Sequence, residues 1–364
     1  MKAKAAVLEA FEQPLVFKDF EVCPLAEGEA LVKLTASGVC GSDVHMWHGK
    51  DPRTPLPMIL GHEGVGEIAD IGGERFDLLG RKLKPGDKVM WERGAMCGHC
   101  YYCVVRKQPA LCPNRKTYGI SFSCTDPPHL RGCYAEYLHL QNTAHYIRID
   151  DDIDPAVLVA ASCSGATAAN AIELSRVRAG DVVLVVGHGP VGLFAMAMSL
   201  KAGASRVYAV GTEADTARLE LAKEFGAAGT LNSADTTSEQ RAEFLRDATG
   251  GIGPNVILDC TGAIGALEEY LPLTAPGGVY SIPGIAEPRR DVSMDVFTNF
   301  ARKGASLQGV WVSDTNHLWQ SIQLVLARDY PFEKLVTHRF ALDDATEALQ
   351  TGAKPEAIKV VLEP

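Results

Sequence analysis

One short stretch of this sequence gathers thiol, hydroxyl, carboxylate and imidazole side chains. Its members are Cys40, Ser42, Asp43, His45, His62 and Glu63. Zn²⁺ binds cysteine sulfur, histidine nitrogen and carboxylate oxygen, and a catalytic zinc keeps one position open for water or substrate. Cys40 and His62 are therefore the candidate ligand pair of a catalytic zinc, although two such residues alone are not a specific signal.

Four cysteines form a second candidate metal site, in a lobe that spans residues 94–115. They are Cys97, Cys100, Cys103 and Cys112. Four thiolates at this spacing can surround one tetrahedral ion and leave no open position, so the lobe predicts a structural zinc. The chain has ten cysteines, and the gathering of four in one segment is typical of metal binding in a reducing compartment rather than of a secreted disulfide framework.

A glycine-rich turn lies between the apolar, β-branched run of residues 181–186 and a helical pattern over residues 193–202. The turn contains Gly187, Gly189, Pro190, Val191 and Gly192. Glycines at this spacing, between a buried strand and a helix, let the backbone approach a pyrophosphate whose charge meets the helix N-terminus. The turn therefore predicts a dinucleotide-binding site.

The end of the next strand, residues 206–210, bears on the choice between NAD and NADP. An acidic residue there bonds the ribose 2′-hydroxyl and repels a 2′-phosphate. The expected position is Gly211, which has no side chain, while Glu213 and Asp215 follow it and Arg218 is the nearest cation. Two carboxylates make a poor phosphate pocket, so the sequence favours NAD and leaves NADP possible.

Later strand-and-helix units repeat the same pattern and end in turns. Ligands of parallel sheets bind beyond the carboxyl ends of the strands. The turn residues expected to lie near the cofactor are Thr261, Gly262, Gly284 and Ile285.

Composition limits the functions that this chain of 364 residues can have. A net charge of −10 argues against a nucleic-acid partner. The apolar run at the N-terminus is too short for a signal peptide, and no long uncharged apolar stretch suggests a membrane span. A cytoplasmic enzyme is therefore expected.

The order of elements predicts an α/β protein of two domains. Short strands and glycine-rich loops fill residues 1–160, strands alternate with helices over residues 161–305, and residues 306–364 return to complete the first domain. Alternating strands and helices indicate a doubly wound parallel sheet of the Rossmann type.

Taken together, the Cys40-to-His45 and Gly61-to-Gly66 motifs, the cysteine lobe and the glycine-rich turn resemble the zinc-dependent medium-chain dehydrogenase/reductase family of alcohol and polyol dehydrogenases. The resemblance covers essentially the whole chain. It implies a GroES-like, mostly-β catalytic domain split around a Rossmann domain, with the active site in the cleft between them. It also implies two zinc ions per chain and a homodimer or homotetramer.

The family's roles are carried over to matching positions of this sequence. Cys40 and His62 would bind the catalytic zinc, with Glu63 as an adjacent, exchanging ligand. The third ligand of this family stands just before the Rossmann strand, where this chain has Cys163. Asp43 would orient His62, and Lys359 matches the family's basic contact to the cofactor pyrophosphate.

The resemblance implies hydride transfer between an alcohol or ketone substrate, secondary or cyclic, and the nicotinamide. Zinc would act as a Lewis acid on the substrate hydroxyl, and Ser42 would pass its proton through the cofactor ribose to His45. The alternatives are an NADPH-dependent carbonyl reductase, a polyol dehydrogenase and, in another class, a non-catalytic nucleotide-binding protein on the same scaffold.

Overall fold

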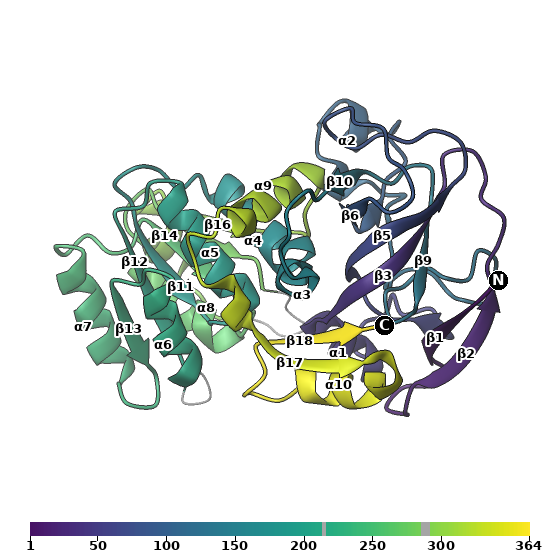
Figure 1. Cartoon of the computed structure of the whole chain (residues 1–364). Helices are drawn as coiled ribbons and strands as arrows, with labels where there is room; N and C mark the ends of the chain where they lie inside the picture. Colours follow the sequence, from purple (N-terminus) through teal and green to yellow (C-terminus); the bar gives the residue numbers. More distant parts are fainter. Residues whose placement is uncertain (213–215, 285–291) are drawn as a thin grey trace. The chain divides into compact units, whose positions relative to one another are not determined.

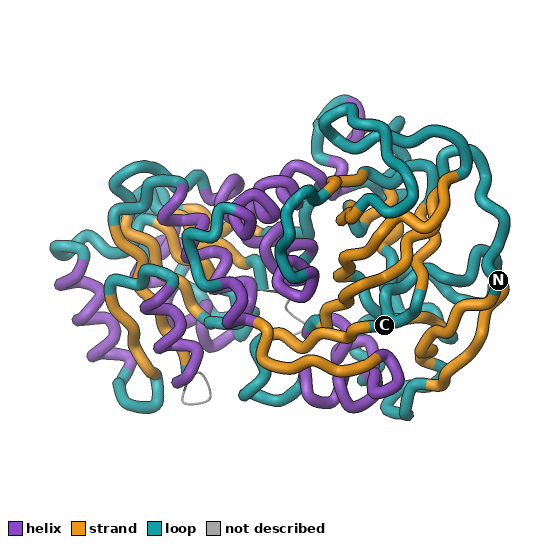
Figure 2. Tube along the Cα trace, viewed as in Figure 1, coloured by secondary structure: helices purple, strands orange, loops and turns teal. Residues whose placement is uncertain are grey.

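The computed structural model describes residues 1–212, 216–284 and 292–364, and the chain divides into two compact units. One of them, called here the β-rich unit, comprises Met1–Cys163, Asp314–Ala327 and Phe332–Pro364. The other, called the α/β unit, comprises Ser164–Ser313 and Arg328–Pro331. Figure 1 labels most helices and strands of both units, and Figure 2 colours the chain by secondary structure.

The β-rich unit contains one large sheet of seven strands. These are β3 (Ala30–Val39), β5 (Glu63–Ile71), β6 (Lys88–Trp91), β9 (Tyr137–Leu140), β10 (Tyr146–Arg148), β17 (Val336–Ala341) and β18 (Lys359–Glu363). Their order is β10-β6-β5-β3-β18-β17, and β9 pairs with β3 outside this path. Because β3 pairs with β5, β9 and β18, it is the strand on which the sheet is centred.

Two smaller sheets and five short helices complete the β-rich unit. The remaining strands are β1 (Lys2–Leu8), β2 (Val16–Glu21), β4 (Met58–Ile59), β7 (Gly94–Ala95) and β8 (Lys116–Thr117). The helices are α1 (Gly41–Trp47), α2 (Tyr101–Val104), α3 (Pro155–Leu158), α9 (Thr315–Leu326) and α10 (Ala345–Gly352). Large apolar side chains such as those of Leu34, Tyr118 and Tyr134 are fully buried between these elements, and their removal from water stabilises the fold.

The C-terminal strand β18 brings the end of the chain back to its beginning. β18 pairs antiparallel with β3, so that Val360 lies opposite Val39 and Leu362 opposite Ser37. On its other side β18 pairs in parallel with β17. The first residue of β18, Lys359, is thereby placed beside the end of β3, where the sequence continues into Cys40.

The α/β unit contains a parallel sheet of six strands. They are β11 (Val182–Val186), β12 (Arg206–Gly211), β13 (Gly229–Asn232), β14 (Val256–Asp259), β15 (Val279–Ile282) and β16 (Ser306–Gly309). The helices are α4 (Ser164–Ser175), α5 (Pro190–Lys201), α6 (Thr216–Glu224), α7 (Ser238–Ala248) and α8 (Ile264–Tyr270). All five residues of β11 are buried, as expected for a β-branched run in the middle of a parallel sheet.

The strand order β13-β12-β11-β14-β15-β16 reverses direction at β11. The chain first passes outward from β11 to β13 and then returns to β14 on the other side of β11. Ligands of open α/β sheets bind outside the carboxyl ends of the strands at such a switch point. The glycine-rich turn after β11 lies at this point.

One segment differs from the sequence-based domain limits. The strand over residues 306–309 was expected in the return to the first domain, but β16 pairs in parallel with β15 and extends the six-stranded sheet. Ser306 donates its backbone N–H to Gly278 O at 3.0 Å, which fixes this pairing. The segment up to Ser313 therefore belongs to the α/β unit.

Within the described part of the chain, a search for membrane-spanning helices finds none that is long and apolar enough by itself. One broken pair, Pro155–Ser162 with Ser164–Ser175, passes the same test by length and composition.

Candidate metal centres and cofactor-binding turns

Four predicted ligands come together in the β-rich unit and are called here the Cys40 cluster. Its members are Cys40, His62, Glu63 and Cys163, and one donor atom from each lies within 4.8 Å of all the others. Cys40 follows β3 and caps α1, His62 directly precedes β5, Glu63 is its first residue, and Cys163 follows the helical segment 155–162. The fold thus joins residues that are far apart in the sequence.

The donor atoms of the Cys40 cluster fit a zinc ion. Cys40 Sγ and Cys163 Sγ are 3.9 Å apart, close to the separation of about 3.8 Å that two Zn–S bonds give at a tetrahedral angle. His62 is 1% exposed and Glu63 is fully buried. Among the described residues, neither His62 Nε2 nor Glu63 Oε1 has a hydrogen-bond partner. Because buried polar atoms are normally satisfied, these two suit metal coordination.

Asp43 contacts the segments that carry two members of the cluster, Cys40 and His62. Its Oδ2 accepts a hydrogen bond from the backbone N–H of Cys40 at 2.8 Å, and its Oδ1 accepts one from Gly61 N–H at 3.3 Å. The same Oδ1 lies 3.3 Å from His62 Nδ1. The carboxylate therefore links the loop that carries Cys40 to the loop that carries His62, where a residue orienting the imidazole would stand.

Lys359, which the family resemblance assigns to the cofactor, has partners within the β-rich unit. Its side chain is 2% exposed, and its Nζ donates to Glu63 Oε2 at 2.8 Å and to Val39 O at 3.1 Å. Burial alone would lower the pKa of Lys359, but the neighbouring Glu63 and Cys40 raise it above its ordinary value. The ammonium is thus a buried partner of Glu63, because β18 pairs with β3.

A glycine opposite makes room for the Glu63 carboxylate. Gly38 pairs with Glu63 across β3 and β5, and a Cβ atom on Gly38 would lie 2.1 Å from Glu63 Oε2. No side chain fits there without moving the carboxylate. The backbone of β3 therefore helps to hold Glu63 between Lys359 and the donor atoms of the cluster.

The two predicted proton-relay residues lie on α1. Ser42 Oγ is 3.9 Å from Cys40 Sγ, and His45 follows one turn later on the same helix. Both side chains are partly exposed. Burial would raise the pKa of Asp51, but hydrogen bonds from Arg53 and the charge of His45 lower it. Asp51 is therefore an acidic neighbour of His45. The sequence analysis did not predict this neighbour.

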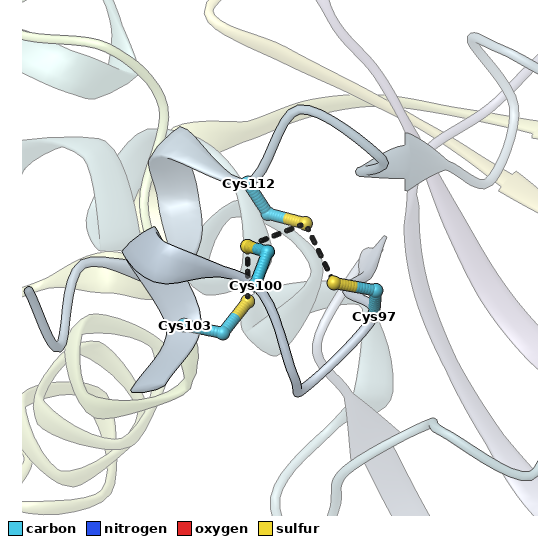
Figure 3. Close-up of side chains that lie close together, drawn as sticks. All are labelled: Cys97, Cys100, Cys103 and Cys112. Carbon is cyan, nitrogen blue, oxygen red and sulfur yellow. Dashed lines mark hydrogen bonds between the residues drawn. The ribbon is translucent and has the colours of Figure 1, made fainter. Parts of the chain in front are cut away.

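The cysteine lobe brings its four thiols together between β7 and β8. Figure 3 shows the side chains of Cys97, Cys100, Cys103 and Cys112 pointing toward one another. The Sγ–Sγ distances are 3.5 Å for Cys100–Cys103, 3.8 Å for Cys100–Cys112 and 3.5 Å for Cys97–Cys112. The backbone N–H of His99 favours a thiolate at Cys97 and lowers its pKa to about 6. The lobe has the donor set and spacing of a closed, four-thiolate zinc site.

The glycine-rich turn of the α/β unit connects β11 to α5, with Gly189 as the N-cap and Pro190 in the first turn of the helix. Gly187 has a positive φ of 88°, and a Cβ atom there would lie 2.6 Å from Thr261 Cγ2. The backbone thus passes close to the β14 turn with its N–H groups at a helix N-terminus, as anion binding requires. Val191 and Gly192 continue into α5.

The other predicted cofactor neighbours lie at strand ends of the same sheet. Thr261 and Gly262 follow β14, Gly284 follows β15 and Gly211 ends β12, while Arg218 lies on α6. Glu213, Asp215 and Ile285 lie outside the described residues. The sheet therefore gathers the described candidates at its carboxyl edge, apart from Arg218.

Sequence reasoning missed a buried cation beside the Cys40 cluster. Arg93 is 4% exposed; burial would lower its pKa, but Cys163 and Glu92 raise it. Glu92 in turn accepts hydrogen bonds from Gly94 N–H at 3.0 Å and from Arg115 at 3.2 Å. The sequence signal that could have indicated this buried pair is the adjacent Glu92 and Arg93, which directly follow the strand β6.

Comparison with known proteins decides the family. Residues 26–151 match the family described as alcohol dehydrogenase GroES-like domain, and residues 190–327 match the one described as zinc-binding dehydrogenase. The 5-exo-hydroxycamphor dehydrogenase of Pseudomonas putida is 33% identical over 99% of this chain and 98% of its own length.

The chain belongs to the zinc-dependent medium-chain dehydrogenase/reductase family.

Further relatives agree with this assignment. The L-threonine 3-dehydrogenase of Escherichia coli is 30% identical over 96% of each chain. A crystal structure of an alcohol dehydrogenase from Thermotoga maritima superposes with a TM-score of 0.96, at 44% identity and over 100% of both chains. The predicted family, the GroES-like and Rossmann fold and the enzyme class are thereby confirmed: this protein is an oxidoreductase that acts on alcohols.

Proposed function

We propose that this dehydrogenase oxidises a secondary or cyclic alcohol with NAD, using one catalytic and one structural zinc ion per chain. The Cys40 cluster carries the proposal, because a dehydrogenase of this kind needs a buried metal site with a position left for substrate. Cys40, His62 and Cys163 would supply three protein ligands to a zinc ion, and a catalytic zinc with three protein ligands can accept a substrate oxygen as its fourth. The cysteine lobe supplies the second, closed site.

Glu63 would alternate between two positions. Its Oε2 is held by Lys359 Nζ at 2.8 Å, while its Oε1 has no hydrogen-bond partner among the described residues and so would be available to a metal. Lys359 thus keeps a fourth donor close to the metal position without committing it there. A zinc ion bound to the cluster supplies Lewis acidity, which lowers the pKa of a substrate hydroxyl.

Ser42 and His45 would remove the substrate proton. The Ser42 hydroxyl lies 3.9 Å from Cys40 Sγ, so a substrate oxygen in the open position would be within reach of it. His45 is on the same face of α1 and is partly exposed, and an imidazole can release a proton to solvent near neutral pH. His45→Ala should slow turnover, and a higher pH should restore it; a loss that does not depend on pH would remove His45 from the relay.

The proposed cofactor is NAD because of the residues that follow β12. Gly211 offers no side chain to a ribose, and the sequence continues through Glu213 and Asp215, whose charges would repel a 2′-phosphate. NADP remains the alternative, and a strong preference for it would favour the reading as a carbonyl reductase.

The names of the relatives support a secondary alcohol as substrate. A 5-exo-hydroxycamphor carries its hydroxyl on a ring carbon, and an L-threonine 3-dehydrogenase acts at the secondary hydroxyl of an amino acid. These two substrates differ in polarity and size but share a CH–OH flanked by two carbons. We infer that this feature, rather than the rest of the substrate, is common to the present enzyme.

Matched pairs of alcohols would test the proposal. Cyclohexanol and cyclohexylmethanol, 2-butanol and 1-butanol, L-threonine and a polyol would each be offered with NAD and with NADP, and reduced nicotinamide would be followed by its absorbance. Higher kcat/KM for the secondary member of the first two pairs, with NAD, is the expected result. Preference for the polyol would favour a polyol dehydrogenase, and no turnover despite two bound zinc ions would favour a non-catalytic protein.

The resemblance also leads us to propose a homodimer or homotetramer. Light scattering after gel filtration would measure the mass directly, and a monomer at enzyme concentrations used in assays would contradict it.

A further inference from the structure

A buried carboxylate holds the turn that follows β14. Asp259 is 1% exposed, and its Oδ1 accepts three hydrogen bonds, from Thr261 N–H at 3.0 Å, Thr261 Oγ1 at 2.6 Å and Gly262 N–H at 3.2 Å. Thr261 Oγ1 then accepts from Ala263 N–H at 3.0 Å. One acid thus fixes two of the turn residues that the sequence analysis placed near the cofactor, Thr261 and Gly262.

Two further contacts anchor this carboxylate and its backbone to β15. Tyr280 donates its hydroxyl to Asp259 Oδ2 at 3.0 Å, and Gly284 donates its N–H to Asp259 O at 3.2 Å. Burial and the charge of Asp259 both raise the pKa of Tyr280, so the phenol stays protonated and remains a donor. Because hydrogen bonds to a charged acceptor are stronger than neutral ones, the arrangement makes the turn rigid.

The turn lies directly beside the glycine-rich turn, on the side away from β12. Val186 pairs with Asp259 on β14 and with Val210 on β12. The next residue, Gly187, approaches Thr261 so closely that a Cβ atom would lie 2.6 Å from its Cγ2. In a Rossmann site the pyrophosphate sits at the glycine-rich turn and the adenosine ribose at the end of the second strand. The remaining half of a dinucleotide therefore extends toward β14.

We propose that Asp259 is a positioning residue that, with Tyr280, holds the Thr261–Gly262 backbone against the nicotinamide-ribose half of the cofactor. This inference rests on the proposed function as an NAD-linked enzyme. It predicts that the Asp259 network selectively affects affinity for the nicotinamide half, while the adenosine half depends on the β11 and β12 ends.

Measuring the binding of NADH and of AMP separates the contribution of the nicotinamide half of the cofactor from that of the adenosine half. The dissociation constants of NADH and of AMP would be measured by calorimetry on the zinc-loaded enzyme. Asp259→Ala should weaken NADH binding about tenfold or more and leave AMP binding within about twofold. It should also reduce the fluorescence enhancement of NADH at saturation, because the ring is held less firmly.

Two milder variants grade the effect. Asp259→Asn keeps one acceptor oxygen for Thr261 but loses the charge, so about a threefold loss for NADH is expected, and Tyr280→Phe removes a single donor and should cost about twofold. These variants carry the test if Asp259→Ala does not fold.

A matched control lies at the other end of the same strand. Thr249 Oγ1 accepts from Gly253 N–H at 2.9 Å and donates to Leu245 O at 2.6 Å, so it also fixes a turn next to β14. Thr249→Val should lower the melting temperature but change neither dissociation constant.

Three results would overturn the inference in distinguishable ways. Wild-type NADH affinity in Asp259→Ala and Asp259→Asn would exclude Asp259 while leaving the proposed function intact. Equal loss of NADH and AMP would show a merely structural role. If the wild-type enzyme binds neither NADH nor NADPH, the proposed function fails and the inference fails with it.

Discussion

The Cys40 cluster and the cysteine lobe each bring four donors together, but they do so in different ways. In the lobe, Cys97 and Cys112 are 15 positions apart, three of the four cysteines are partly exposed, and all donors are thiols. In the Cys40 cluster, Cys40 and Cys163 are 123 positions apart, and the other two donors are a buried histidine and a buried glutamate. A short segment can build the first kind of site, whereas only a completed fold can build the second.

The surroundings of the two centres differ as well. Asp43 stands behind His62, Lys359 pairs with Glu63, and Arg93 lies beside Cys163. Buried charges need partners of this kind, because an isolated one is costly in a protein interior. A mixed donor set with an exchangeable fourth member suits reaction with a substrate, and a uniform set of four thiols suits a structural role.

The largest effect is expected from Cys40→Ser. Loss of a metal ligand should remove one of two zinc ions and lower kcat/KM about 10³-fold or more, since Lewis-acid assistance is worth several kcal/mol. Zinc content and turnover would be measured on the same sample. Cys23→Ser is the matched control, because Cys23 is outside both metal groups and should retain two zinc ions and full turnover. Unchanged turnover with one zinc lost would contradict the assignment.

Cys103→Ser should break the other centre with the opposite pattern. The lobe would lose its zinc and its local order, because binding energy at a structural site is folding energy. A fall of several degrees in melting temperature is expected, about 2–4 °C per kcal/mol for a protein of this size, while kcat/KM stays within about tenfold. Activity lost as completely as in Cys40→Ser would show that the two centres are not separable.

Lys359→Met tests the charged partner that only the Cys40 cluster has. It leaves Glu63 buried without its cation, which costs about 3–5 kcal/mol, and frees the carboxylate to compete for the open metal position. Lower stability and slower turnover with two zinc ions retained are expected. The double variant with Glu63→Gln should recover much of the stability in a thermal unfolding assay. Wild-type behaviour of the single variant would mean that the Lys359–Glu63 pair has no influence.

The smallest effect concerns an acid far from both centres. Asp77 accepts hydrogen bonds from Leu79 N–H at 2.9 Å and from Arg81 N–H at 2.9 Å; burial would raise the pKa of Asp77, but Arg81 lowers it below its ordinary value. Its stabilisation is therefore complete above the unfolded-state pKa and is lost as pH falls through the lower folded-state value.

Asp77→Asn should cost about 1–2 kcal/mol at neutral pH, and the difference in melting temperature from the wild type should close as the pH falls through the lowered pKa of Asp77. Zinc content should not change at neutral pH. The variant thus measures how protonation of one structural carboxylate lowers the stability of the fold, separately from any loss of stability caused by release of zinc at low pH. A difference in melting temperature between the variant and the wild type that stays constant as the solution is acidified would contradict the stabilising role given to the Asp77 carboxylate.

Features built by residues that are close together in the sequence could be predicted from the sequence, and features built by distant residues could not. The spacing of Cys97, Cys100, Cys103 and Cys112 predicted the lobe, and the turn between residues 181–186 and the next helix predicted the switch point, because neighbouring residues determine both. Cys163 was assigned only through the family resemblance, since no local pattern links it to Cys40. The thiols are 3.9 Å apart because the strands and helices between them pack into one unit.

The features that the sequence did not predict depend on pairing between distant segments. The antiparallel register of β18 with β3 brings the Lys359 ammonium to Glu63, a pairing that no local pattern indicates. Residues 306–309 were expected in the first domain, but their pairing with β15 places them in the other sheet. The role of Asp259 was also missed, although an aspartate two residues before a Thr-Gly pair is a local signal for a side-chain-held turn.

Anomalous diffraction at the zinc absorption edge, from crystals of the zinc-loaded enzyme, tests the central claim most directly. The account predicts two peaks per chain: one among the four thiols of the lobe, and one bonded to Cys40, His62 and Cys163 with room for an oxygen. A peak in the lobe alone, or a second peak whose fourth position is permanently filled by Glu63 in the presence of a substrate alcohol, would contradict it.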